Sequence, residues 1–153
     1  MVALIFEVAG QRYGLDVMQV LEILPVVPLR RLPHVPDYVA GVFRHREALV
    51  PVIDLSELIS GKPAARLLST RIVLVRYTGP SGSASALGLL AEKATNLDEG
   101  TSRLTPSGLA TPDAPFLGGL NAAGTIQYVN VEQLLPADLR GRLFVEDENH
   151  DLP

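Results

Sequence analysis

The apolar residues of this chain fall into short runs, and turn-forming residues end each run before a long helix could form. Residues 4–8, 12–17, 48–53 and 71–77 are β-prone runs. Runs of this length, bounded by glycine, proline and small polar residues, are typical of strands. The chain also contains 13 glycines and 12 prolines, which supply the boundaries. The pattern predicts a mostly β fold, either a barrel or a sandwich, with a few short helices.

Three local patterns refine this prediction. Apolar residues in 17–24 recur at helical spacing, which predicts a short helix or a switch from strand to helix. Pro51 interrupts a strong β run and therefore places that strand at a sheet edge or at a bulge. Asp54 or Ser56 is expected to cap a short helix over 55–59.

The two halves of the chain repeat the same order of elements. The matching segments are 13–17 with 87–91, 38–42 with 116–120, and 49–59 with 126–135. This match aligns Gly41 with Gly119 and Asp54 with Asn130. Coincidence among β-rich segments would not preserve the order of elements, so duplication is favoured. The repeat predicts two similar small barrels packed side by side, with the groove between them as the natural binding surface.

Composition excludes several classes of protein. With no cysteine, the chain has no disulfide, thiolate nucleophile or cysteine-type metal centre. The net charge of −4 is concentrated at one end, because residues 145–153 carry four acidic residues and no lysine or arginine. Acidic and basic residues are equal in number in the rest of the chain, which argues against a nucleic-acid-binding protein. We expect 145–153 to be a disordered acidic tail.

No part of the sequence predicts a membrane segment or an export signal. The apolar run at the N-terminus is short and lacks a basic region before it, unlike a signal peptide. No run reaches the roughly 20 apolar residues that a membrane-spanning helix needs. The sequence therefore predicts a cytoplasmic protein with no direct membrane insertion.

The residues that carry chemistry do not form a recognisable catalytic or metal site. His34, His45 and His150 lack the spacing of a metal-binding helix. Asp54 and Glu57 could be paired catalytic carboxylates, but a capping role for Asp54 is favoured. An enzyme needs an activated nucleophile or a matched acid and base, and neither is found. The sequence predicts a binding protein without catalytic residues, metal or cofactor.

Several motifs, taken together, resemble the CheW-like domain, the coupling protein of bacterial chemosensory arrays. The matching segments are Tyr13–Val17, Val20 with Glu22 and Ile23, Leu32–Pro36, Gly41–Val42, Arg46 and Val50–Leu55. The resemblance extends to about Leu135. The segments 68–77 and 134–139 are similar to the WspB branch, which serves the surface-sensing Wsp pathway.

The resemblance implies a fold and a function. The fold is a single domain over 1–140, built from two five-stranded barrels of the Src-homology-3 type. One subdomain covers about 1–65 and the other about 66–136, with the exchange of strands between them left open. The implied function is a non-enzymatic adaptor. It joins the cytoplasmic tip of methyl-accepting chemoreceptors to the regulatory domain of a CheA-type histidine kinase, itself a CheW-like domain, and is recruited to membrane-associated arrays.

The resemblance also implies two sets of contact residues. The receptor-binding groove is expected to contain Val20, Glu22, Arg44, His45 and Arg46. The kinase-binding edge is expected to contain Leu29, Arg30, Arg31 and Leu49. A partly buried ion pair that only orients the groove wall is the structural alternative for Glu22 and Arg46. A solvated face is the alternative for Arg30 and Arg31.

The chain departs from the family at one turn. The usual family run is Gly-Val-Ile-Asn-Leu-Arg-Gly, whereas residues 41–47 read Gly-Val-Phe-Arg-His-Arg-Glu. Glu47 replaces the turn glycine, so a positive φ there would be strained. Arg44, His45 and Arg46 are expected to form a basic lip suited to a more acidic receptor tip, unless Arg44 simply pairs with Glu47.

Two other functions stay open on the sequence. One is a regulatory β-barrel module that binds a small ligand in the groove between the barrels. The other, more distant, is a hydrolase that uses Asp54 and Glu57.

Overall fold

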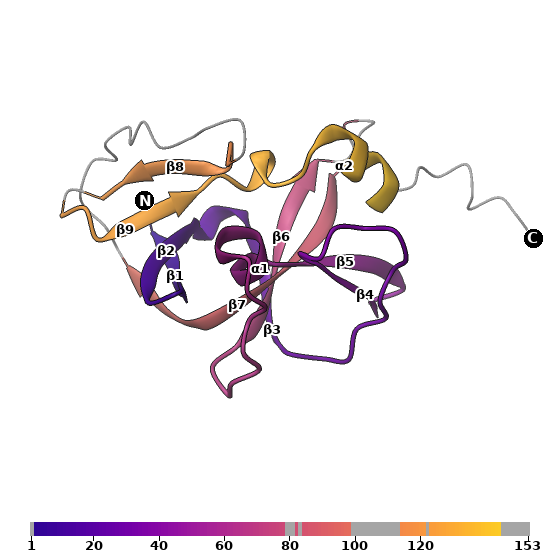
Figure 1. Cartoon of the computed structure of the whole chain (residues 1–153), viewed down its shortest axis with the longest axis horizontal. Helices are drawn as coiled ribbons and strands as arrows, with labels where there is room; N and C mark the ends of the chain where they lie inside the picture. The colour runs from indigo at the N-terminus through magenta and orange to yellow at the C-terminus, as the bar shows by residue number, and fades with distance from the viewer. Residues whose placement is uncertain (1, 79–81, 83, 99–113, 122, 145–153) are drawn as a thin grey trace, which may run out of the picture.

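The computed structural model describes residues 2–78, 82, 84–98, 114–121 and 123–144, and the chain in these ranges is built mainly from strands (Figure 1). The strands are β1 Ala3–Val8, β2 Gln11–Asp16, β3 Val20–Pro25, β4 Val39–His45, β5 Ala48–Asp54, β6 Arg71–Thr78, β7 Ala84–Asp98, β8 Leu117–Leu120 and β9 Ile126–Val129. The helices are α1 Leu55–Ser60 and α2 Ala137–Leu143, with 3-10 turns at Val17–Gln19 and Val131–Gln133.

The strands form two barrels that share β7. Barrel A contains β8, β9, β2, β1 and the second part of β7, and barrel B contains β3, β6, the first part of β7, β5 and β4. The 15 residues of β7 are enough to serve both, and Figure 1 shows the strand curving from β6 to β1. Its register against β1 shifts between Ile5 and Glu7, and Lys93 has φ 54°. This bulge lets β7 bend from one barrel to the other. The predicted mostly β fold is confirmed.

Matching backbone contacts confirm the internal repeat. In barrel B, the N–H of Asp54 donates to the carbonyl oxygen of Tyr38 at 2.7 Å. In barrel A, the N–H of Asn130 donates to the carbonyl oxygen of Phe116, also at 2.7 Å. Asp54 and Asn130 then each cap the short helical segment that follows. Each half therefore has an aromatic residue, a strand and a capping residue in the same order, joined by the same backbone hydrogen bond.

The repeat also shows how the halves exchange strands, which the sequence left open. Gly14 in β2 pairs in parallel with Tyr128 in β9, and Gly88 in β7 pairs in parallel with Val52 in β5. At both glycines an added Cβ would lie 3.0 Å from the side chain of the paired residue. In each half, the strand that carries this glycine (β2 or β7) thus pairs with the other half's strand that leads into the capped helical segment (β9 or β5). The N-terminal hairpin β1–β2 belongs to the same barrel as the C-terminal strands β8 and β9.

The core follows the two-residue alternation of the strands. In β6, Ile72 and Leu74 point into barrel B, whereas Val73, Val75 and Tyr77 face the largest hydrophobic cluster. That cluster also takes side chains from β1, β2, β5, β7, β9 and α2. It fills the space between the barrels, which the sequence had assigned to a binding groove. The small-ligand alternative therefore loses its expected site.

Three local expectations have different outcomes. The helix expected over 17–24 is wrong beyond a three-residue 3-10 turn, because the following residues form β3, with alternating burial. Pro51 pairs with Val42 in β4, and pairing with β7 begins only at the next residue. The strand is thus unpaired on one side at the proline, as an edge position requires. The helix capped by Asp54 is confirmed as α1.

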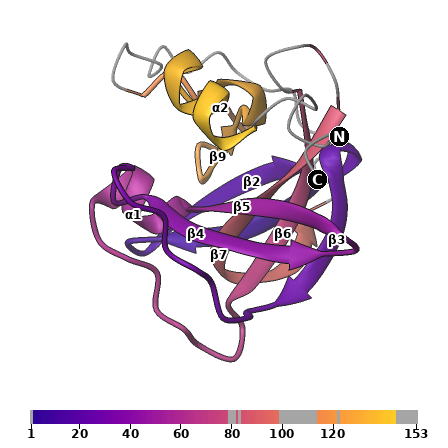
Figure 2. The same cartoon turned by 90° about the vertical axis from the view of Figure 1, so that its right-hand side faces the viewer.

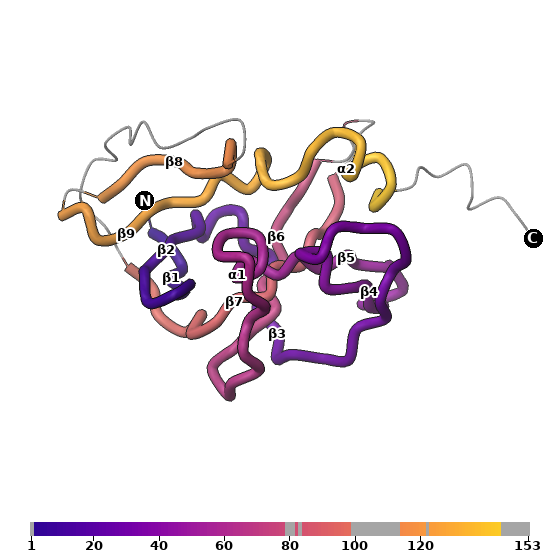
Figure 3. Tube along the Cα trace, viewed as in Figure 1, coloured from indigo at the N-terminus to yellow at the C-terminus, as the bar shows by residue number. Residues whose placement is uncertain are grey.

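Helix α2 was not expected from the sequence. It packs against β6 and against the connector between β3 and β4. Phe144 stacks on Tyr77 with ring centroids 5.4 Å apart, and Arg142 Nη1 donates to the carbonyl oxygen of His34 at 2.8 Å. Burial raises the pKa of Tyr38, and the nearby Asp138 carboxylate raises it further. Figure 3 shows α2 on the same side of the molecule as β4 and β5.

No helix in the described ranges is long and apolar enough to cross a membrane. The acidic segment 145–153 lies outside the described residues.

Candidate functional site

Barrel B has an open seam between its two terminal strands. The pairing order is β3, β6, β7, β5, β4, and within the described chain no ladder joins β3 to β4. In Figure 2, β4 and β5 cross the front of barrel B and β3 lies at the right of the molecule. One isolated bridge covers the free edge of β4, where Arg30 and Val42 exchange two backbone hydrogen bonds of 2.9 Å. The unpaired edges make this seam the natural place for a partner to bind.

A groove of about 600 Å³ follows the seam. Its floor is apolar and its rim is basic. The lining residues are Leu24, Pro25, Val27, Pro28, Arg30, Val42, Phe43, Arg44, His45 and Leu49. No acidic side chain is among them. Leu49 stands 64% exposed on the rim, directly opposite Arg44 in the β4–β5 ladder.

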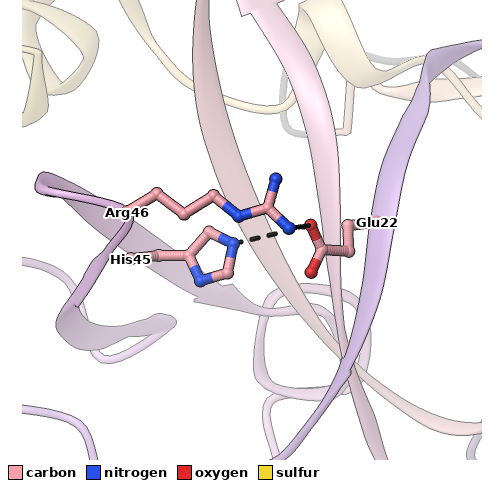
Figure 4. Close-up of polar contacts among 3 residues, drawn as sticks. All are labelled: Glu22, His45 and Arg46. Atoms are coloured by element: carbon pink, nitrogen blue, oxygen red, sulfur yellow. Dashed lines mark ion pairs between the residues drawn. The ribbon is translucent and has the colours of Figure 1, made fainter.

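A cluster of charges joins the two sides of the seam at one end (Figure 4). Glu22 Oε1 in β3 lies 3.1 Å from Arg46 Nη2 and 3.6 Å from His45 Nε2. The side chains of Arg46 and Glu22 are 76% and 30% exposed. Exposed pairs of this kind contribute only about 0–1 kcal/mol of stability. The ion pair therefore adds little to the stability of the fold.

The residues predicted for receptor binding do not all share one surface. Glu22 and Arg46 form an ion pair with His45 beside it, and Arg44 lines the groove next to them. Val20 instead packs against the core between the barrels. A bulge in β3 separates the two residues, because Val20 pairs with Val75 and Glu22 with Leu74, its neighbour in β6. Val75 faces the cluster between the barrels and Leu74 faces the core of barrel B, so only the glutamate reaches the seam.

The residues predicted for kinase binding are also divided. Arg30 and Leu49 line the same groove as Arg44, so the two predicted sets adjoin there. Leu29 packs against the core of barrel B, and Arg31 is exposed beside it. The sequence did not predict the groove floor, formed by Leu24, Val27 and Phe43. Leu24 was assigned to the helix expected over 17–24, and Val27 and Phe43 were assigned to no site.

The turn between β4 and β5 adopts the strained backbone that its sequence implied. Arg46 has φ 50° and Glu47 has φ 68°, and His45 pairs with Ala48 across a two-residue turn. Glycine and asparagine are favoured at both positions of such a turn. Arg44 Nη1 reaches the main-chain carbonyl oxygen of Glu47 at 3.5 Å. The contact of Arg44 with Glu47, which was the alternative to a basic lip, is therefore made to the backbone of Glu47.

Glu47→Gly is expected to stabilise the protein by about 1 kcal/mol, because glycine adopts a positive φ without strain. The thermal midpoint should rise by about 2–4 °C. Glu47→Ala is the matched control, since it removes the same carboxylate and keeps the Cβ. Equal midpoints for the two variants would show that backbone strain is not the cause.

Asp54, one of the two carboxylates offered for hydrolysis, is used structurally. Asp54 is 5% exposed; its Oδ1 accepts from the N–H of Glu57 at 3.1 Å and its Oδ2 from the N–H of Ala64 at 2.9 Å. A carboxylate with both oxygens bound to backbone N–H groups is committed to capping. Across the described residues, no three histidine or acidic side chains gather as a metal site would require.

Comparison with known proteins agrees with this architecture. The family model of the CheW-like domain matches residues 2–139. The chain is 27% identical over 143 residues to the chemotaxis protein CheW of Klebsiella aerogenes, covering 88% of this chain and 81% of the relative. It is 30% identical over 129 residues to protein FrzA of Myxococcus xanthus, covering 82% and 78%.

A solved structure has the same fold. The crystal structure of the scaffolding protein TtCheW from Thermoanaerobacter tengcongensis superposes with a TM-score of 0.70 at 22% identity, covering 88% of this chain and 87% of that one. The two-barrel arrangement, the repeat and the match over residues 2–139 lead to one conclusion. The chain belongs to the CheW-like domain family.

Proposed function

We propose that this protein is a non-enzymatic adaptor that couples methyl-accepting chemoreceptors to a CheA-type histidine kinase in a bacterial chemosensory array. The observation that carries the proposal is the seam of barrel B, where an apolar groove with a basic rim lies between β3 and β4, which no ladder joins within the described residues. A surface of this kind suits reversible binding to another protein. Membership of the CheW-like family supports the proposal.

The groove suits a receptor tip that carries both apolar and acidic side chains. Leu24, Val27 and Phe43 supply apolar contact, while Arg44 on the rim supplies positive charge. Because charged rims act mainly on specificity and association rate, the arginine selects among tips of similar shape. The replacement of the family's neutral pair by Arg44 and His45 supports an acidic tip as the partner.

The kinase regulatory domain is proposed to bind beside the receptor, at the edge formed by Arg30, Arg31 and Leu49. Leu29 supports this edge from within, through its packing against the core of barrel B. Small contacts at a strand edge are individually weak, and an array strengthens them by multivalency.

Binding requires no cofactor, and the protein is proposed to be cytoplasmic and recruited to arrays. The similarity to the WspB branch extends the proposal to surface sensing.

Arg44→Glu is expected to weaken binding to a chemoreceptor cytoplasmic fragment about tenfold, because it places a carboxylate where an acidic tip would bind. Kinase binding should stay within about twofold. Arg31→Glu should show the reverse pattern. Both affinities can be measured by biolayer interferometry on the purified chain.

Arg66→Glu is the control, because this exposed arginine lies on the loop between α1 and β6 and does not line the groove. Equal receptor binding by wild type and Arg44→Glu would contradict the proposed receptor site. Failure of the wild-type chain to bind either protein would contradict the adaptor function itself.

A further inference from the structure

The rim of the groove carries positive charge that the described chain does not neutralise. Arg30 and Arg44 both line the groove, and no carboxylate in the described ranges forms an ion pair with either. Arg44 has only the 3.5 Å contact with a backbone carbonyl. Arg46, by contrast, is paired with Glu22. Two arginines beside an apolar floor form a site for an acidic segment with a few apolar side chains.

The chain contains such a segment. Residues 145–153 read Val-Glu-Asp-Glu-Asn-His-Asp-Leu-Pro, with four carboxylates, two large apolar side chains and no lysine or arginine. Because the rest of the chain is balanced in charge, this segment holds the entire negative excess. Its charge and its apolar residues complement the rim and the floor of the groove.

The segment begins close enough to reach the groove. Arg142 Nη1 binds the carbonyl oxygen of His34, so the end of α2 lies on the connector that leads from the groove. Arg30 precedes His34 by four residues, which span at most about 14 Å. Nine extended residues span about 30 Å, about twice that distance. Figure 3 shows α2 and β4 on the same side of the molecule.

We propose that the acidic segment 145–153 binds in the seam groove of its own barrel B, with its carboxylates on Arg30 and Arg44. The contact is intramolecular, so a covalent tether gives it an effective concentration of about millimolar and weak contacts suffice. Its charges are exposed to solvent, and salt weakens it. An acidic partner must displace the segment before it can bind the groove. This regulatory consequence rests on the proposed function, whereas the contact does not.

Paramagnetic labelling tests the contact directly. The chain has no cysteine, so Asn149→Cys gives a single attachment site for a nitroxide. Bound to the groove, the label should broaden the amide NMR signals of Val42, Phe43 and Leu49 at low salt. Broadening should fall at least about fourfold in 0.5 M salt, where the screening length is a few ångströms. It should also fall after Glu146→Gln, Asp147→Asn, Glu148→Gln and Asp151→Asn are combined.

The double variant Arg30→Glu/Arg44→Glu should abolish the broadening, and Arg66→Glu should leave it unchanged. Broadening confined to α2, or to the loop 61–70, would overturn the proposal, as would groove signals that the label does not affect. In a separate binding assay, neutralising the segment should raise the affinity for an acidic receptor fragment several-fold. If the labelled contact is seen but no receptor binds, the segment does occupy the groove and only the proposed function fails.

Discussion

Gly41→Ala is expected to lower the free energy of unfolding by about 3 kcal/mol, because the new methyl group has no room. An added Cβ at this position would lie 2.6 Å from the carbonyl oxygen of Arg30 and 3.0 Å from the Cβ of Leu29. Its φ of 149° is also unfavourable for residues other than glycine. The obstacle is mainly backbone, so no side-chain rotation can relieve it.

The clash lies at the bridge that covers the free edge of β4. Arg30 and Val42 exchange their two hydrogen bonds next to Gly41. Moving the connector away to admit a methyl group would break this bridge and widen the groove. We therefore expect Gly41→Ala to weaken partner binding as well as stability.

Thermal and urea denaturation measure the effect, and Gly10→Ala is the matched control. Gly10 also has a positive φ, of 79°, but nothing lies within 4 Å of its added Cβ. The control isolates the backbone strain, which costs about 1 kcal/mol. Similar losses for the two variants would mean that the close approach of Arg30 does not constrain the native state.

Most of the fold could be predicted because the strands carry their signal locally. The hairpin of β1 and β2, the strand β6 and the capped helix α1 follow from alternation, turn residues and Asp54. The repeat was also visible, since its matching residues make the same contacts in both halves. The exchange of strands was not, because it depends on which distant strands pair, and sequence alternation contains no information on that choice.

The site was predicted only in part, for a physical reason. Glu22 and Arg46 were assigned by resemblance, and the structure brings them to 3.1 Å. The groove beside them arises because barrel B stays open between β3 and β4, the strands at the two ends of its pairing order. In the sequence, Leu24 was assigned to the helix expected over 17–24, and nothing marked Phe43 as part of a site. Only the tertiary arrangement leaves them on the floor of a surface groove.

Asp54→Ala is expected to lower the free energy of unfolding by about 3 kcal/mol, since two backbone N–H groups lose their acceptor. The N–H of Glu57 loses its cap, which costs about 1 kcal/mol. The buried N–H of Ala64 loses Oδ2, and an unsatisfied buried donor costs about 1–3 kcal/mol. Asp54→Asn should cost about half as much, because its amide oxygen can still cap α1.

The internal repeat supplies the control for this experiment. Asn130 holds the equivalent position in barrel A, but it is exposed and its side chain accepts a single N–H, from Glu132 at 3.2 Å. Asn130→Ala should therefore cost about 1 kcal/mol or less. The difference between the two alanine variants, measured by urea denaturation, isolates the second hydrogen bond of Asp54. Equal losses would show that the contact with Ala64 contributes nothing, and that capping alone explains an acidic residue at this buried position.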